Sequence, residues 1–237
     1  MDLLLIAAIV PPLILLVYIY RMDKVEREPV GLIVKLVIFG ILSVIPTAFV
    51  ETVLNSFLIQ GVFAGMTGVL VRAIEYFLCV ALVEEGFKYL FLKLGSWRHP
   101  AFDYCFDAVV YAVTVSLGFA LFENIGYVSQ FGIEVAGLRA VTAIPGHCIF
   151  GIFMGHFYGL AKMAEADGNE GVKRSMLKKA LWVPVLLHGF YDFAASSGTA
   201  MMTLVFFAFI IVVDVIAYRQ IKAYAASDTK VNRGEWW

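Results

Sequence analysis

Long apolar stretches restrict the fold of this chain more than any other feature of its sequence. Seven of them approach or exceed the length at which a helix crosses a bilayer, which is about 20 residues. They cover residues 3–20, 30–54, 69–94, 104–128, 138–163, 180–195 and 199–218. The alternating pattern of outer-membrane barrel strands is not visible. The sequence therefore predicts an all-α, polytopic membrane bundle of about seven transmembrane helices.

The composition agrees with a membrane protein and excludes other classes. Of the 237 residues, 61% are hydrophobic and only 16% are charged, whereas soluble domains are about 45–50% apolar. The formal net charge of −1 gives no case for nucleic-acid binding. We find no internal repeat and no second, soluble domain, so we expect one membrane-embedded domain over residues 1–237.

Lysine and arginine are distributed unevenly between the loops. If the loops alternate between the two sides of the membrane, one set of loops holds nearly all of the basic residues. The other set holds only Arg72 and Arg139, at the starts of the third and fifth stretches. Cytoplasmic loops carry an excess of basic residues. We therefore expect the N-terminus outside, the C-terminus in the cytoplasm, and a strongly charged cytoplasmic loop over residues 164–179.

Two adjacent carboxylates, Glu84 and Glu85, lie inside the third apolar stretch. One charge at the centre of a membrane helix costs about 2.5–3.5 kcal/mol, so a pair of charges needs a reason. Lys88 lies one helical turn beyond Glu84, and we expect it to neutralise one carboxylate but not easily both. The pair is either a structural ion pair that joins helices or part of a polar cavity in which carboxylates do chemistry.

Three later stretches carry polar residues at a similar depth. Glu123 and Tyr127 share one helix face, His147 follows a Pro-Gly pair, and Asp192 lies one turn after His188. Taken singly, Glu123 could be a helix-end group that reaches interfacial water, with Tyr127 in the aromatic belt. His147 alone could be an interhelical hydrogen bond. With the expected topology and a rise of about 1.5 Å per residue, they fall with the Glu pair into one layer, from the middle to the outer part of the membrane. Scattered structural pairs do not predict such a layer.

Carboxylates and imidazoles at one depth suit two chemistries. A glutamate can act as general base on a water molecule, with histidine assisting. We expect Asp192 to accept a hydrogen bond from one ring nitrogen of His188 and to leave the other nitrogen free to act. Alternatively, His147, His188 and Glu85 could hold a catalytic zinc ion. The helical His-Glu-x-x-His spacing is absent, so we favour the metal-independent glutamate chemistry.

Four motifs, in order and on separate stretches, resemble those of the PrsW family of intramembrane proteases. That family is related to the CAAX-prenyl endopeptidases and the bacterial Abi proteins. The resemblance covers the third to the sixth stretch. The motifs are Glu84-Glu85-Gly86-Phe87-Lys88 for E-E-x-x-K, Phe122-Glu123 with Tyr127 for F-E-x-x-x-Y, His147 with Ile149-Phe150-Gly151, and His188 with Asp192 for H-x-x-x-D.

The resemblance implies an endopeptidase of a bacterial or archaeal cytoplasmic membrane, with its catalytic core at about residues 69–197. Such an enzyme cuts single-pass membrane proteins, for example anti-sigma factors, near the outer face. Its partners are that substrate and the lipid bilayer, and no cofactor is certain, with zinc as the alternative. The implied catalytic residues are Glu84, Glu85, His188, His147 and Glu123, and the supporting residues are Lys88, Tyr127, Asn124 and Asp192.

Two other functions use the same residues. Intramembrane Glu and His also form proton relays, so a proton-coupled transporter is the first alternative. The paired internal repeats of many transporters are not seen here, which counts against it. The second alternative is a non-catalytic membrane sensor, in which the polar cluster only holds the helices together.

Overall fold

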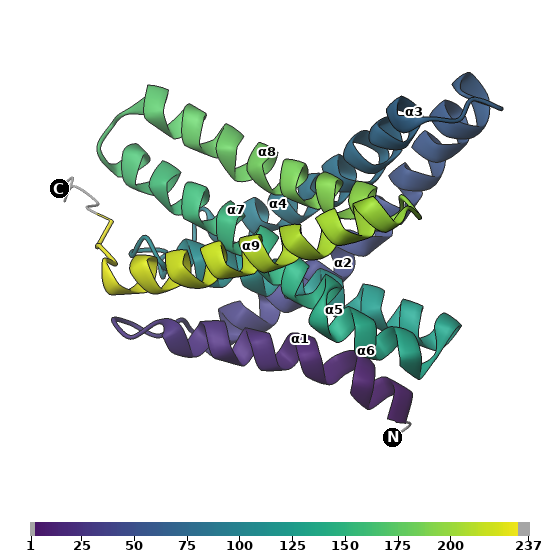
Figure 1. The fold of residues 1–237 in the computed structure, drawn as a ribbon. Coiled ribbons are helices and arrows are strands. Elements are labelled where there is room, and N and C mark those ends of the chain that lie inside the picture. Colours follow the sequence, from purple (N-terminus) through teal and green to yellow (C-terminus); the bar gives the residue numbers. More distant parts are fainter. Residues whose placement is uncertain (1–2, 232–237) are drawn as a thin grey trace.

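The computed structural model describes residues 3–231, and every long element in that range is a helix (Figure 1). This confirms the all-α prediction. Two short segments, labelled η1 and η2, are π-helical and continue their neighbours without a break. The elements are α1 (Leu3–Met22), α2 (Val30–Leu54), η1 (Asn55–Val62), α3 (Val69–Ile74), η2 (Glu75–Ala81), α4 (Leu82–Ser96), α5 (Asp107–Phe131), α6 (Ile133–Val141), α7 (Ala143–Ala166), α8 (Glu170–Ala195) and α9 (Ala200–Ala226).

Each of the seven apolar stretches corresponds to helix in the structure, and the chain is a multi-pass membrane protein. Within residues 3–231, five helical stretches are long and apolar enough to cross a membrane. The continuous helix from α3 to α4 and helix α8 are not among them, because both carry more charge. The five are Leu3–Met22, Val30–Val62, Asp107–Phe131, Ile133–Ala166 and Ala200–Ala226.

The charged loop expected over residues 164–179 is much shorter than predicted. Helix α7 continues to Ala166 and α8 already begins at Glu170. The side chain of Asn169 accepts a hydrogen bond from the backbone N–H of Val172 at 3.1 Å and so caps the start of α8. The charged residues that suggested a loop lie instead on the first turns of this helix, where the exposed face keeps them in water.

Helix α5 is the central helix of the bundle and packs against α1, α2 and α7 (Figure 1). Glycines allow this close packing. A Cβ atom at Gly155 of α7 would lie 2.5 Å from the Cα of Val109, and one at Gly40 of α2 would lie 2.1 Å from the carbonyl oxygen of Val115. Small residues let membrane helices approach to backbone contact. The relative positions of α2, α5 and α7 are therefore set by main-chain atoms.

The same packing brings α4, α5, α7 and α8 together around the polar residues of the expected layer. Helix α7 lies against both α5 and α8, while α8 also packs against η2 and α4. The inward faces of α4, α5, α7 and α8 carry the polar residues of the expected layer.

Candidate active site

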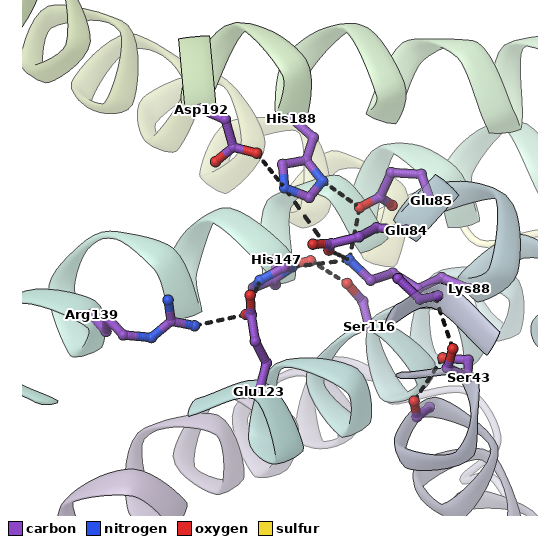
Figure 2. Close-up of polar contacts among 12 residues, drawn as sticks. Ser43, Glu84, Glu85, Lys88, Ser116, Glu123, Arg139, His147, His188 and Asp192 are labelled. Carbon is purple, nitrogen blue, oxygen red and sulfur yellow. Dashed lines mark hydrogen bonds and ion pairs between the residues drawn. The ribbon is translucent and has the colours of Figure 1, made fainter. Parts of the chain in front are cut away.

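The ammonium group of Lys88 lies at the centre of a buried polar cluster (Figure 2). Its Nζ atom is 2.9 Å from Glu84 Oε2, 2.9 Å from Glu85 Oε1 and 3.1 Å from His147 Nδ1. It also lies 4.0 Å from the centroid of the Phe119 ring. Positions three and four residues apart share a helix face, so both carboxylates reach the same ammonium group. Its single positive charge still balances only one of the two negative charges, as the sequence analysis expected.

His147 lies between Lys88 and Glu123 (Figure 2). Its Nε2 atom is 3.0 Å from Glu123 Oε2. An ammonium group can only donate hydrogen bonds, so Nδ1 of His147 accepts one from Lys88. The ring proton is therefore on Nε2, which donates to Glu123. These two contacts hold the ring in one orientation and one neutral tautomer. The hydroxyl of Ser116 donates to the main-chain carbonyl of His147 at 2.7 Å and fixes the backbone there.

His188 lies between two carboxylates. Its Nε2 atom is 3.2 Å from Asp192 Oδ2, so the expected contact with Asp192 is present. The second nitrogen is not free, however, because Nδ1 lies 2.9 Å from Glu85 Oε1. Ionised carboxylates only accept hydrogen bonds, so both ring nitrogens donate and the ring carries a positive charge. The ring of Phe150 stacks on it with centroids 4.9 Å apart.

Arg139 of α6 holds the outer part of the cluster in place, and the sequence analysis gave it no role in the site. It is 2.7 Å from Glu123 Oε2, its Nε donates to Asn124 Oδ1 at 2.8 Å, and its guanidinium group lies 4.1 Å from the Tyr127 ring centroid. The amide of Asn124 in turn donates to the carbonyl of Ala8 at 2.8 Å. The signal for Arg139 was its position as one of only two basic residues in its set of loops.

A cavity of about 550 Å³ opens beside this cluster. Glu84 lies in its wall, whereas Glu85 is fully buried behind it. Glu51 of α2, which the sequence analysis left without a role, also borders the cavity. The lining includes six of the residues singled out from the sequence, namely Glu84, Glu123, Tyr127, His147, His188 and Asp192. The two neighbouring carboxylates therefore have different surroundings, and only Glu84 faces space in which a substrate can lie.

Glu84, Glu85 and His147 each offer a donor atom within 4.8 Å of the others. Carboxylate and imidazole are donors that zinc accepts, although the set proposed from the sequence had His188 in place of Glu84. Both nitrogens of His188 face carboxylates. The place between the three grouped donors is taken by the Lys88 ammonium group, which contacts all of them. This arrangement does not fit a metal ion beside Lys88.

Comparisons with known proteins find relatives along nearly the whole chain. Residues 28–218 match the model of a family described as PrsW family intramembrane metalloprotease. A protein named Protease PrsW from Oceanobacillus iheyensis is 38% identical, with 95% of this chain and 97% of that protein covered. Proteins of the same name from Bacillus subtilis and Clostridioides difficile are 34% and 30% identical, covering 79% and 98% of this chain and 80% and 94% of their own lengths. No solved structure matches the chain significantly.

Proposed function

From the premise that the chain belongs to the PrsW family of intramembrane metalloproteases, we propose that it hydrolyses a peptide bond in a single-pass membrane protein such as an anti-sigma factor. The family makes it a peptidase of the bacterial cell membrane rather than a transporter or a sensor. The observation that carries the proposal is the position of Glu84 in the wall of a cavity of about 550 Å³, beside His147 and His188. Residues 69–197 form the proposed catalytic core, and the cavity side of the bundle is the proposed outer side.

In this proposal Glu84 is the general base. Its carboxylate takes a proton from a water molecule while the water oxygen bonds to the carbonyl carbon of the substrate. The positively charged ring of His188 then gives a proton to the leaving nitrogen, and the C–N bond breaks. His188 Nε2 lies 3.9 Å from Glu84 Oε2, so the proton taken from water can pass to His188 through one bridging water molecule. That transfer restores both groups for the next cycle.

The other residues of the cluster hold these two groups in place. Glu85 and Asp192 contact the two nitrogens of His188 and stabilise its positive charge. Lys88 contacts the Glu84 side chain at 2.9 Å and holds it in place. His147, whose ring centroid lies 5.5 Å from that of His188, and Glu123 also line the cavity, and Tyr127 and Asn124 support them through Arg139. We derive no step through a metal ion, because Lys88 occupies the place between the candidate donors.

Cleavage of a single-pass substrate in proteoliposomes tests the proposal. Glu84→Gln and His188→Ala should each abolish cleavage, because they remove the base and the acid. Glu85→Gln should also abolish it, because His188 loses a contact that fixes its orientation and charge. Glu75→Gln, on the same continuous helix but outside the cavity wall, is the matched control and should cleave normally.

Two results would contradict different parts of the proposal. Full cleavage by all three site variants would exclude this cluster as the active site. Loss of wild-type cleavage on chelation, with recovery on adding Zn²⁺, would exclude the metal-independent reaction but keep the cluster as the site. We expect cleavage to continue in the presence of the chelator.

A further inference from the structure

A second group of buried carboxylates lies far from the cavity. Asp23 follows the end of α1, Glu28 precedes the start of α2, and Asp107 is the first residue of α5. Asp107 and Glu123 are sixteen positions apart on α5, which corresponds to about 24 Å along the helix. This group therefore belongs to the end of the bundle where the C-terminal segment lies (Figure 1), and it has no part in the proposed reaction.

The three carboxylates point toward one another. Each offers an oxygen within 4.8 Å of the others, and the residues are only 3%, 4% and 1% exposed for Asp23, Glu28 and Asp107. Among the described residues, nothing donates a hydrogen bond to Asp23 Oδ2 or to Asp107 Oδ1. Buried polar atoms are nearly always satisfied, so two unsatisfied carboxylate oxygens in one group indicate a missing partner.

The contacts that the group does make bring no positive charge to it, although a side-chain hydrogen bond joins Glu28 and Asp107. Asp107 Oδ2 accepts from the backbone N–H groups of Asp103 and Tyr104 at 3.0 and 2.7 Å, and Glu28 accepts from the hydroxyl of Tyr111. Within residues 3–231, none of the ion pairs includes Asp23, Glu28 or Asp107. The ion pair at this end joins Lys230 to Asp103 instead, at 3.9 Å.

A fourth carboxylate comes from the C-terminal segment. Asp228 Oδ1 accepts from the N–H of Phe106 at 2.8 Å, while its Oδ2 has no donor among the described residues. Burial raises the pKa of Asp228 and of Asp23, and the two carboxylates repel each other. Burial likewise raises the pKa of Glu28, to about 7. A bound cation would offset the cost of holding these groups together in their charged forms.

We propose that Asp23, Glu28 and Asp107 bind a hard divalent cation, Mg²⁺ or Ca²⁺. All of the donors are carboxylate oxygens, which these ions prefer. The group contains no imidazole and no thiolate, the donors typical of zinc sites. With Asp228 beside them, the ion links the α1–α2 loop, the start of α5 and the C-terminal segment. On the expected topology this end faces the cytoplasm, where Mg²⁺ is the abundant divalent cation.

Thermal unfolding of the full chain in detergent, after treatment with a chelator and its removal, tests the site. MgCl₂ or CaCl₂ at 100 times its Kd should raise the Tm of the wild type by roughly 5–10 °C. Asp107→Asn and Glu28→Gln keep the size of the side chain but remove a charged ligand, so they should abolish the rise. Glu26→Gln, at an exposed position of the same loop, is the matched control and should keep the full rise.

Two further variants keep the test decisive. Glu84→Gln/Glu85→Gln removes two candidate donors near the cavity, so a rise that persists in this double variant assigns the cation to the second group. If Asp107→Asn does not fold, Asp23→Asn in the loop takes its place. No rise with either cation in the wild type, or an undiminished rise in Glu28→Gln, would overturn the proposal. The carboxylates would then be satisfied by shared protons rather than by a metal ion.

Discussion

Replacing Lys88 with methionine should cost the protein much of its stability. The change keeps a long side chain but removes the ammonium group that lies 2.9, 2.9 and 3.1 Å from Glu84, Glu85 and His147. Removing one partner of a buried ion pair costs about 3–5 kcal/mol, because the other charge stays buried without compensation. Lys88 and Glu85 are both 0% exposed, so the full range applies.

The expected loss corresponds to a large shift in thermal unfolding. For a chain of this size, each kcal/mol moves the Tm by about 2–4 °C, so the Tm of Lys88→Met should fall by roughly 6–20 °C. The measurement is thermal unfolding of purified protein in detergent. Lys93→Met is the matched control, since Lys93 is exposed on the same helix, and it should change the stability by no more than about 0.5 kcal/mol.

A double-mutant cycle identifies the cause of the loss. Lys88→Met leaves Glu84, Glu85 and Asp192 facing the single positive charge of His188. Glu85→Gln removes one of these three carboxylates, so the double variant should be more stable than Lys88→Met alone. The coupling energy should fall within about 0.5–3 kcal/mol. A Tm of Lys88→Met within about 2 °C of the wild type would refute the reasoning. So would strictly additive effects of the two substitutions, since the two groups would then not interact.

Three further predictions rest on other contacts. In Lys88→Ala, Zn²⁺ should raise the Tm more than in the wild type, because the place between the grouped donors is opened; equal shifts would contradict this. Gly40→Ala should lower the free energy of unfolding by about 1–3 kcal/mol, because its Cβ would lie 2.1 Å from the Val115 carbonyl oxygen. Gly31→Ala, with nothing within 4 Å, is its control. Burial raises the pKa of Glu28 from 4.5 to about 7. Without divalent cations, the free energy of unfolding should therefore be highest below pH 4.5 and fall as the pH rises through about 7. This fall with pH should be smaller in Glu28→Gln.

Contacts within one helix were the most predictable part of the candidate site. The spacing of His188 and Asp192 predicted their contact, because positions four apart are neighbours on any α-helix. Even there, Lys88 contacts both Glu84 and Glu85, since an ammonium group has three hydrogens and both spacings reach it. That the seven apolar stretches form helices was predictable for a similar reason, because a helix that crosses the membrane needs about 20 apolar residues.

Contacts between helices could not be predicted in the same way. The pairing of Arg139 with Glu123 depends on the short helix α6, which the sequence analysis did not separate from its neighbour. The position of Glu51 in the cavity wall depends on how far α2 is rotated about its axis. The free nitrogen expected on His188 was lost because α4 presents Glu85 to it. The position and rotation of each helix depend on how the helices pack, and the hydropathy of the sequence does not predict them.

The glycine contacts of α5 have a consequence for how a substrate enters. A layer of interlocking side chains can adapt by changing rotamers, whereas touching backbones cannot move closer or slide without breaking the fold. Glu123 and His147 are carried by two helices joined in this way, so their separation stays constant while the cavity fills. The walls that can yield are those made of side chains, such as Thr203, Phe206 and Phe207 of α9. In the proposed reaction, a peptide segment would therefore meet one rigid side, which carries Glu123 and His147, and one side that adjusts to its shape.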